Sequence, residues 1–207
     1  MLDLDQAFAQ PAVLPAAAET PQPTRAEAEA AVRTLIRWAG DDPAREGLLA
    51  TPARVVRAYE EWFAGYRQDP ASLLSRTFGE VGGYDELVIL RDIPLQSTCE
   101  HHLAAIRGVV HIAYLPNQRV VGISKLARLV EAFGRRLQIQ ERLTVEIADT
   151  LAKVLQPRGV AVIVEASHEC LSSRGVRLHG VSMQTRRLLG EFAHQPRRQE
   201  ILATLAG

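Results

Sequence analysis

The residues best suited to chemistry lie in two short segments, 97–102 (STCEHH) and 167–170 (SHEC), which hold both cysteines and three of the six histidines. Cys99 and His102 are three positions apart, so they share a face if their segment forms a helical turn. His168 and Cys170 are two positions apart, so they share a face if their segment is extended. A turn and a strand end could therefore bring two thiols and an imidazole to one point.

This set of side chains is typical of a zinc site, because zinc binds thiolates and imidazoles together. The expected ligands are Cys99, His102 and Cys170, with His101 and His168 standing beside them. Three protein ligands leave one position of a tetrahedral ion open, which is typical of a catalytic rather than a structural zinc. Water in that position would have its pKa lowered towards neutrality and would become a nucleophile.

Spacing alone leaves other interpretations of the two cysteines open. A Cys-x-x-His pair recurs by chance, and a buried cysteine commonly packs as a small hydrophobic residue. A disulfide between Cys99 and Cys170 is a further alternative, although nothing in the sequence indicates an oxidising compartment.

Length and composition bound the remaining possibilities. The 207 residues fit one domain with a tail, or at most two small domains. With 24 basic and 24 acidic residues the net charge is +0, so bulk charge gives no argument for nucleic acid or membrane binding. No apolar run approaches membrane-spanning length, and residues 1–5 lack the layout of a signal peptide. We therefore expect a cytoplasmic protein with reduced thiols.

The elements that position these segments are predicted from periodicity and turn residues. Residues 1–24, rich in Ala and Pro, are expected to be a disordered tail. The predicted order is helix, helix, three strands, helix, helix, two strands, helix, which indicates an α+β fold with an antiparallel sheet. Helices are predicted over 25–40, 51–65, 124–137, 141–155 and 195–206, and strands over 87–93, 108–115, 119–121, 159–166 and 182–192.

Three of these predictions are specific at the residue level. The second helix should bury Val55, Tyr59 and Phe63, which recur every four residues. The strand over 119–121 should return antiparallel to the strand before it. The third helix should start with Ser124 as its N-cap.

Cations at two predicted helix starts raise the question of an anion site. Lys125 and Arg128 lie three apart in the first turn of the third helix, where free backbone N–H groups favour phosphate. An ordinary solvated face is the alternative. Arg54 lies in the first turn of the second helix, so it is either a surface charge or an anion contact.

Several segments together resemble the GTP cyclohydrolase I family. They follow in order over about residues 26–200, nearly the whole chain beyond the tail. The matching segments are 45–55 (REGLLATPARV), 97–103 (STCEHHL), 111–116 (HIAYLP), 122–128 (GISKLAR), 138–144 (QIQERLT), 168–170 (HEC) and 174–176 (RGV). Two segments depart from the family pattern, 104–106 (AAI) and 182–185 (SMQT), and neither contains a predicted zinc ligand.

The resemblance implies a tunnelling fold, in which an antiparallel sheet carries helices on one face. It implies a single domain over 25–207, with a helical extension over 25–80 and a core over 81–207. Subunits would close into a β-barrel ring, and two rings of five would form a homodecamer. GTP and water would become 7,8-dihydroneopterin triphosphate and formate, the first step of tetrahydrofolate and pterin synthesis, with one zinc ion per subunit.

The resemblance also implies roles for individual residues. Cys99, His102 and Cys170 match zinc ligands, whereas His101, His168 and Ser124 match catalytic positions. Glu141 matches the acid that anchors guanine, and Gln140 beside it is also expected to bind the substrate. The residues expected to contact the ribose and triphosphate are Ser124, Lys125, Arg128 and Arg174. Arg54 is expected to reach the phosphates from a neighbouring subunit.

Two rival functions follow from the same residues. One is a nitrile-reducing enzyme of the same fold, which would need a nucleophilic cysteine and no zinc. The other is a non-catalytic zinc-stabilised binding module, which would account for the ligands but not for His101, His168 and Glu141.

Overall fold

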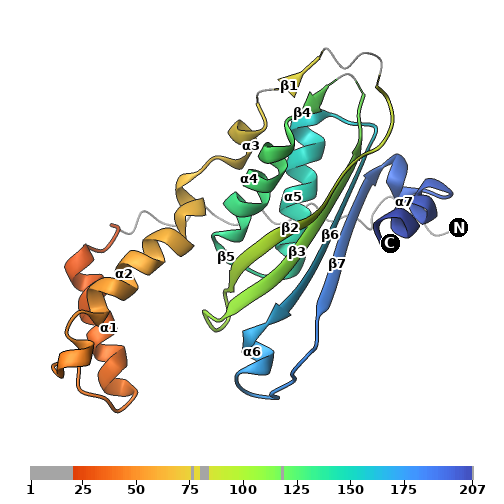
Figure 1. Ribbon diagram of the computed structural model, residues 1–207. Helices are drawn as coiled ribbons and strands as arrows, with labels where there is room; N and C mark the ends of the chain where they lie inside the picture. The colour runs from red at the N-terminus through yellow and green to blue at the C-terminus, as the bar shows by residue number, and fades with distance from the viewer. Residues whose placement is uncertain (1–20, 76, 80–83, 118, 207) are drawn as a thin grey trace, which may run out of the picture. The chain divides into compact units, whose positions relative to one another are not determined.

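The computed structural model describes residues 21–75, 77–79, 84–117 and 119–206 (Figure 1). The tail expected over 1–24 therefore lies outside the described residues up to position 20. The chain divides into two compact units, Met1–Arg57 and Ala58–Gly207, and each is described by itself.

The first unit contains helix α1 (Arg25–Trp38) and the start of helix α2 (Thr51–Trp62). Thr24 caps α1: its side chain accepts a hydrogen bond from the Glu27 backbone N–H, and the Glu27 carboxylate accepts one from the Thr24 N–H at 2.7 Å. This reciprocal capping box satisfies two backbone donors at the helix start. A short 3-10 helix, Glu46–Leu48, precedes α2.

Helix α2 begins at Thr51 as predicted, but its buried face differs from the expected one. Val55 and Phe63 are only half-buried and Tyr59 is 39% exposed, so the predicted stripe is wrong. The helix also ends at Trp62 rather than at Gly65, which is buried in the following 3-10 helix, Ala64–Arg67. Periodicity identifies the face of a helix that could pack, but the rest of the chain determines how far it is covered.

The second unit is organised around a five-stranded sheet in the order β5-β2-β3-β6-β7. Neighbouring strands are antiparallel except β5, which runs parallel to β2, so the sheet is mixed rather than wholly antiparallel. The α+β class is nevertheless confirmed. The strands are β2 (Val88–Cys99), β3 (Ala105–Leu115), β5 (Leu137–Gln138), β6 (Gly159–His168) and β7 (Met183–Gly190).

The predicted return strand over 119–121 pairs elsewhere. Strand β4 (Val120–Val121) pairs antiparallel with β1 (Thr77–Phe78) in a separate two-stranded sheet. Strand β3 already has β2 on one side and β6 on the other, so neither of its edges is free for β4. The expected pairing with β3 is therefore wrong.

Helices cover both faces of the large sheet (Figure 1). Helices α4 (Ile123–Gly134) and α5 (Gln140–Leu155) bury their apolar stripes against one face, where Val110 and Ile112 are fully buried. Helix α7 (Arg197–Ala206) packs on the opposite face against residues such as Ala113. Because side chains alternate along a strand, β3 supplies apolar residues to both faces, and the expected one-sided arrangement is wrong for α7.

Three short details complete the elements that position the site. Helices α3 (Pro70–Leu73) and α6 (Glu169–Ser172) are single turns. The N-cap of α4 is Gly122, with no side-chain cap, so Ser124 lies inside the first turn instead of capping it. In the part of the chain that the structure describes, no helix is both long and apolar enough to cross a membrane.

Candidate metal centre

Two separate strand ends bring three ligand-type side chains together. Cys99 ends β2, His102 lies in the turn after it, and Cys170 lies in α6 just after β6. The two Sγ atoms and an imidazole nitrogen all lie within 4.8 Å of one another. The sheet explains this meeting, because β3 pairs antiparallel with both β2 and β6, so those two strands end at the same edge.

The local structure of the second segment differs from the prediction. Cys99 belongs to the strand, and a tight turn returns the chain to β3, with the Leu103 N–H donating to Cys99 O at 2.9 Å. Strand β6 stops at His168, so Cys170 projects from a helical turn rather than from an extended strand. The meeting of the segments and the turn after Cys99 are confirmed, whereas the extended backbone expected through Cys170 is wrong.

The donor set fits a soft or borderline divalent cation such as zinc. Both cysteines are free thiols, so no disulfide joins them. Burial raises the pKa of the Cys170 thiol, the nearby Cys99 thiol raises it further, and Arg174 lowers it. A divalent cation reverses this balance, because a coordinated thiol is deprotonated. Cys99 is only 4% exposed, which removes water from one side of the group.

Arg174 and His101 lie beside this group. The Arg174 Nη1 atom is 3.0 Å from the His102 Nε2 atom. His101 is exposed, with its ring centroid 6.4 Å from that of His102 and its Nε2 atom 3.9 Å from a carboxylate oxygen of Glu100. A cation and a second imidazole therefore stand next to the expected ligands.

The start of α5 meets the other predicted catalytic histidine. The His168 Nε2 atom is 2.8 Å from the Gln140 Oε1 atom. Burial lowers the pKa of His168, and the negative charge of Glu141 opposes that shift. Glu141 itself is exposed, so its carboxylate is open to a ligand. The structure thus gathers Gln140, Glu141 and His168 in one place.

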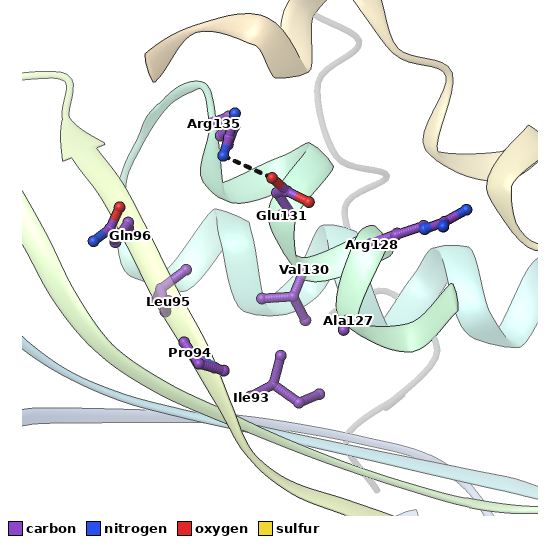
Figure 2. A pocket seen from close by; sticks show the side chains of 9 residues that line it. All are labelled: Ile93, Pro94, Leu95, Gln96, Ala127, Arg128, Val130, Glu131 and Arg135. Atoms are coloured by element: carbon purple, nitrogen blue, oxygen red, sulfur yellow. Dashed lines mark ion pairs between the residues drawn. The ribbon is translucent and has the colours of Figure 1, made fainter. Parts of the chain in front are cut away.

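The predicted phosphate contacts on α4 lie elsewhere in the chain. Arg128 is one of the residues that line a cavity of about 270 Å³ between α4 and β2, and its side chain points away from the strand (Figure 2). Lys125 lies nearer the start of α4, where its Nζ atom donates to the Leu73 carbonyl at 2.8 Å. Ser124 is exposed beside it.

The lengths of helix α4 and strand β2 indicate how far Lys125 lies from the three expected metal ligands. A side chain added at Gly134, the last residue of α4, would meet the Gln96 carbonyl at 3.0 Å. This end of the helix therefore lies beside the strand residue that is three positions before Cys99. Lys125 is nine residues back along the helix, or about 14 Å at the usual rise. The strand from Gln96 to Cys99 adds about 10 Å. Within one copy of the chain, Lys125 therefore lies far from the three expected ligands.

Arg54 belongs to the first unit, where it is exposed on α2.

One contact network near the ligands was not predicted. Arg142 on α5 donates to a Glu100 carboxylate oxygen at 2.6 Å and to the Gln138 side-chain oxygen at 3.2 Å. Gln138 is 1% exposed and also donates to Glu146 at 2.8 Å. Arg142 thereby ties the turn that carries the ligands to α5. Its segment 138–144 matched the family resemblance, but no pattern in the sequence singled out Arg142 within that segment.

Comparisons with known proteins agree on one family. A sequence model described as GTP cyclohydrolase I matches residues 28–206. A relative named GTP cyclohydrolase 1 from Maricaulis maris (strain MCS10) is 59% identical over 177 residues, which is 86% of each chain. Relatives of the same name are 56% identical in Allorhizobium ampelinum, over 84% of this chain and 87% of theirs, and 53% identical in Brucella anthropi, over 89% and 86%.

A solved structure overlaps this chain in part. It is the crystal structure of the archaeosine synthase QueF-Like in the apo form, with a TM-score of 0.43 and 21% identity. The overlap covers 50% of this chain and 93% of the other. A likeness of this extent has no bearing on function.

Proposed function

This chain belongs to the GTP cyclohydrolase I family, and on that premise we propose that it converts GTP and water into 7,8-dihydroneopterin triphosphate and formate. The observation that carries the proposal is the group formed by Cys99, His102 and Cys170, with His101 in the same turn and His168, which feels the charge of Glu141, two residues before Cys170. The expected product is the first intermediate of tetrahydrofolate and pterin synthesis.

The three ligands would hold one zinc ion per subunit. Two thiolates and an imidazole favour zinc over harder cations, which prefer oxygen ligands. When bound, zinc supplies a Lewis acid that makes water nucleophilic at neutral pH. Arg174, next to His102, adds a positive charge that a phosphate group can pair with.

Two histidines would move protons during opening of the guanine imidazole ring. His101 is exposed next to the ligands, and His168 is half-buried against Gln140. Imidazole titrates near neutrality and can both take and give a proton at the pH of the cell. Breaking a carbon–nitrogen bond of the ring needs protonation of the leaving nitrogen, which suits such a group.

Glu141 would select guanine. Guanine offers a ring N–H and an exocyclic amino group along one edge, and a carboxylate can accept from both. Glu141 is exposed at the start of α5 and close enough to His168 to act on its charge state. Adenine lacks this pair of donors, so ATP is expected to be rejected.

A second copy of the chain would complete the site. Ser124, Lys125 and Arg128 lie in the N-terminal half of α4, away from the helix end that adjoins Gln96, so their proposed contacts with ribose and triphosphate require a neighbour. Ser124, proposed as catalytic, would act there too. Arg54 would also come from a neighbouring copy. We extend the proposal to the two stacked five-membered rings that the family resemblance implies.

Metal analysis beside a GTP turnover assay separates this proposal from its rivals. The proposed enzyme contains zinc and releases formate from GTP. The nitrile-reducing alternative would act without zinc, and the binding module would hold zinc and leave GTP unchanged. Purified protein that holds zinc without consuming GTP would therefore overturn the proposed activity.

A further inference from the structure

Gln140 is a buried side chain whose hydrogen bonds are all made inside the protein. It is the first residue of α5 and is 1% exposed. Its amide nitrogen donates to Val164 O at 3.1 Å, to Met183 O at 2.9 Å and to Thr185 Oγ1 at 3.2 Å. Two amide hydrogens are thus shared among three acceptors, and none remains for a bound ligand.

These partners determine which way the amide points. Main-chain carbonyl oxygens only accept hydrogen bonds, so a flipped amide would press its oxygen against the oxygens of Val164 and Met183. The nitrogen must therefore face the strands β6 and β7. The amide oxygen is left to face His168, whose Nε2 atom is 2.8 Å away.

Two threonines agree with this orientation. The Thr144 hydroxyl donates to the main-chain oxygen of Gln140 at 2.7 Å. The Thr185 hydroxyl lies 2.6 Å from the Thr144 hydroxyl and donates to it, because the hydrogen of Thr144 is already used. Thr185 then has a free lone pair for the Gln140 amide, so every donor in the chain of bonds has an acceptor.

We propose that Gln140 is a positioning residue that holds His168 as the tautomer with a hydrogen on Nε2 and leaves Nδ1 as its basic atom. An amide oxygen can only accept, so the Nε2 atom opposite it must carry the hydrogen. A neutral imidazole then has an unprotonated Nδ1. The inference rests on the proposed function only in that His168 moves a proton during the reaction, and it assigns Gln140 no contact with guanine.

Solid-state NMR of the metal-loaded full chain, with histidine labelled by ¹³C and ¹⁵N, measures the tautomer directly. Protonated and unprotonated ring nitrogens resonate far apart, and the His168 signal is identified by its loss in His168→Asn. At a pH well above the usual imidazole pKa, the wild type should have hydrogen on Nε2 of His168. Hydrogen on Nδ1 instead would overturn the proposal.

Two variants extend the test to catalysis. Gln140→Leu removes the acceptor, so the Nε2–H form should lose its dominance and kcat should fall by roughly 10²-fold or more, with little change in KM for GTP. A guanine contact would instead raise KM. Thr185→Val removes one acceptor of the Gln140 amide nitrogen and leaves its two main-chain acceptors, so the amide oxygen should still face His168 and the Nε2–H signal should be retained. Loss of that signal in Thr185→Val, or an unchanged kcat in a folded Gln140→Leu, counts against the proposal.

Folding and function are kept apart in this design. If Gln140→Leu does not fold, as judged by circular dichroism and zinc content, the wild-type and Thr185→Val spectra still decide. If the wild type does not turn over GTP, the proposed function fails, whereas the tautomer of His168 is still measured and still tests Gln140.

Discussion

His101 and His102 are neighbours in sequence with different surroundings. His102 belongs to the group of ligand atoms within 4.8 Å of one another, whereas His101 lies outside it near Glu100. Adjacent residues in a turn point in different directions, so one can bind a metal while the other faces the substrate. Mutation of each should therefore have a different result.

His101→Ala is expected to keep its zinc and to lose about 10²–10⁴-fold in kcat, because a proton-transfer group is removed and no ligand is lost. Zinc content by elemental analysis, measured beside GTP turnover, tests this. His194→Ala, on an exposed histidine at the other end of the sheet, serves as the control and should match the wild type. If zinc leaves together with activity in His101→Ala, the roles of the two adjacent histidines have been exchanged.

Glu141→Gln is expected to weaken GTP binding by roughly ten- to a hundredfold, because a hydrogen-bonded charged partner of the base is lost. Zinc content and melting temperature should stay near those of the wild type. Isothermal titration calorimetry with GTP measures the affinity. Asp149→Asn, an exposed acid on the same helix that pairs with Arg187, is the matched control. Unchanged GTP affinity in Glu141→Gln would leave the carboxylate with only a helix-end role.

At the scale of elements, the close approach of β3 and β6 depends on a residue without a side chain. A Cβ atom at Gly108 would lie 2.0 Å from the Glu165 carbonyl oxygen and 2.6 Å from the Ala166 Cβ. Gly108 pairs with Ala166 in the ladder that aligns the ends of β2 and β6. Position 108 therefore helps to set where the metal ligands meet.

Gly108→Ala should lower the free energy of unfolding by about 1–3 kcal/mol, or prevent folding, because strand backbones must move apart. Zinc affinity should fall with it, since the two ligand segments lose their register. Thermal unfolding and zinc titration measure both effects. Gly79→Ala is the control, because nothing lies within 4 Å of a Cβ at that position. Equal stability of the two variants would mean that the ladder absorbs the added methyl group.

Much of the element order could be predicted from sequence, and the reasons are local. In the run 159–166 only Glu165 is polar and four residues are β-branched, and β6 (Gly159–His168) is buried along most of its length. Thr24 and Glu27 form a capping box that depends only on residues three apart. The two-residue strand β5 has no periodic signal, and its parallel pairing with β2 depends on the folded sheet.

The candidate site could be predicted where residue type alone indicates chemistry. Cysteine and histidine identified the three expected ligands before any geometry was known. Gln140 and Arg142 are common polar residues, and their contacts with His168 and Glu100 follow from the tertiary structure. Periodicity could not assign these contacts, because the partners lie 28 and 42 residues away.

At the scale of the whole molecule, the large sheet has open edges. Within the described residues, β5 pairs with β2 only at Thr98 and Cys99, and β7 is the last strand on the other side. Unpaired strand edges favour pairing with another chain. Apolar residues such as Leu103 and Ile123 are more than half exposed, at 53% and 66%. These features support assembly from several copies of the chain.

A mixing experiment tests whether two copies share one site. Cys170→Ser should lack zinc and Lys125→Ala should lack a phosphate contact, so each variant alone should be nearly inactive. Co-expression should restore part of the activity, because some sites combine Cys170 of one copy with Lys125 of another. Cys170→Ser mixed with Cys99→Ser is the control and should stay inactive. A monomer by analytical ultracentrifugation, or no recovery in the first mixture, would contradict a shared site.

The most direct test of the central claim is the amount of formate released per GTP by the protein before and after zinc is removed. The wild type with one zinc ion per chain should release one formate for each GTP consumed. Chelation should abolish the release, and added Zn²⁺ should restore it, because Cys99, His102 and Cys170 bind the metal again. Zinc-loaded protein that leaves GTP intact, or equal formate release without metal, would contradict the account.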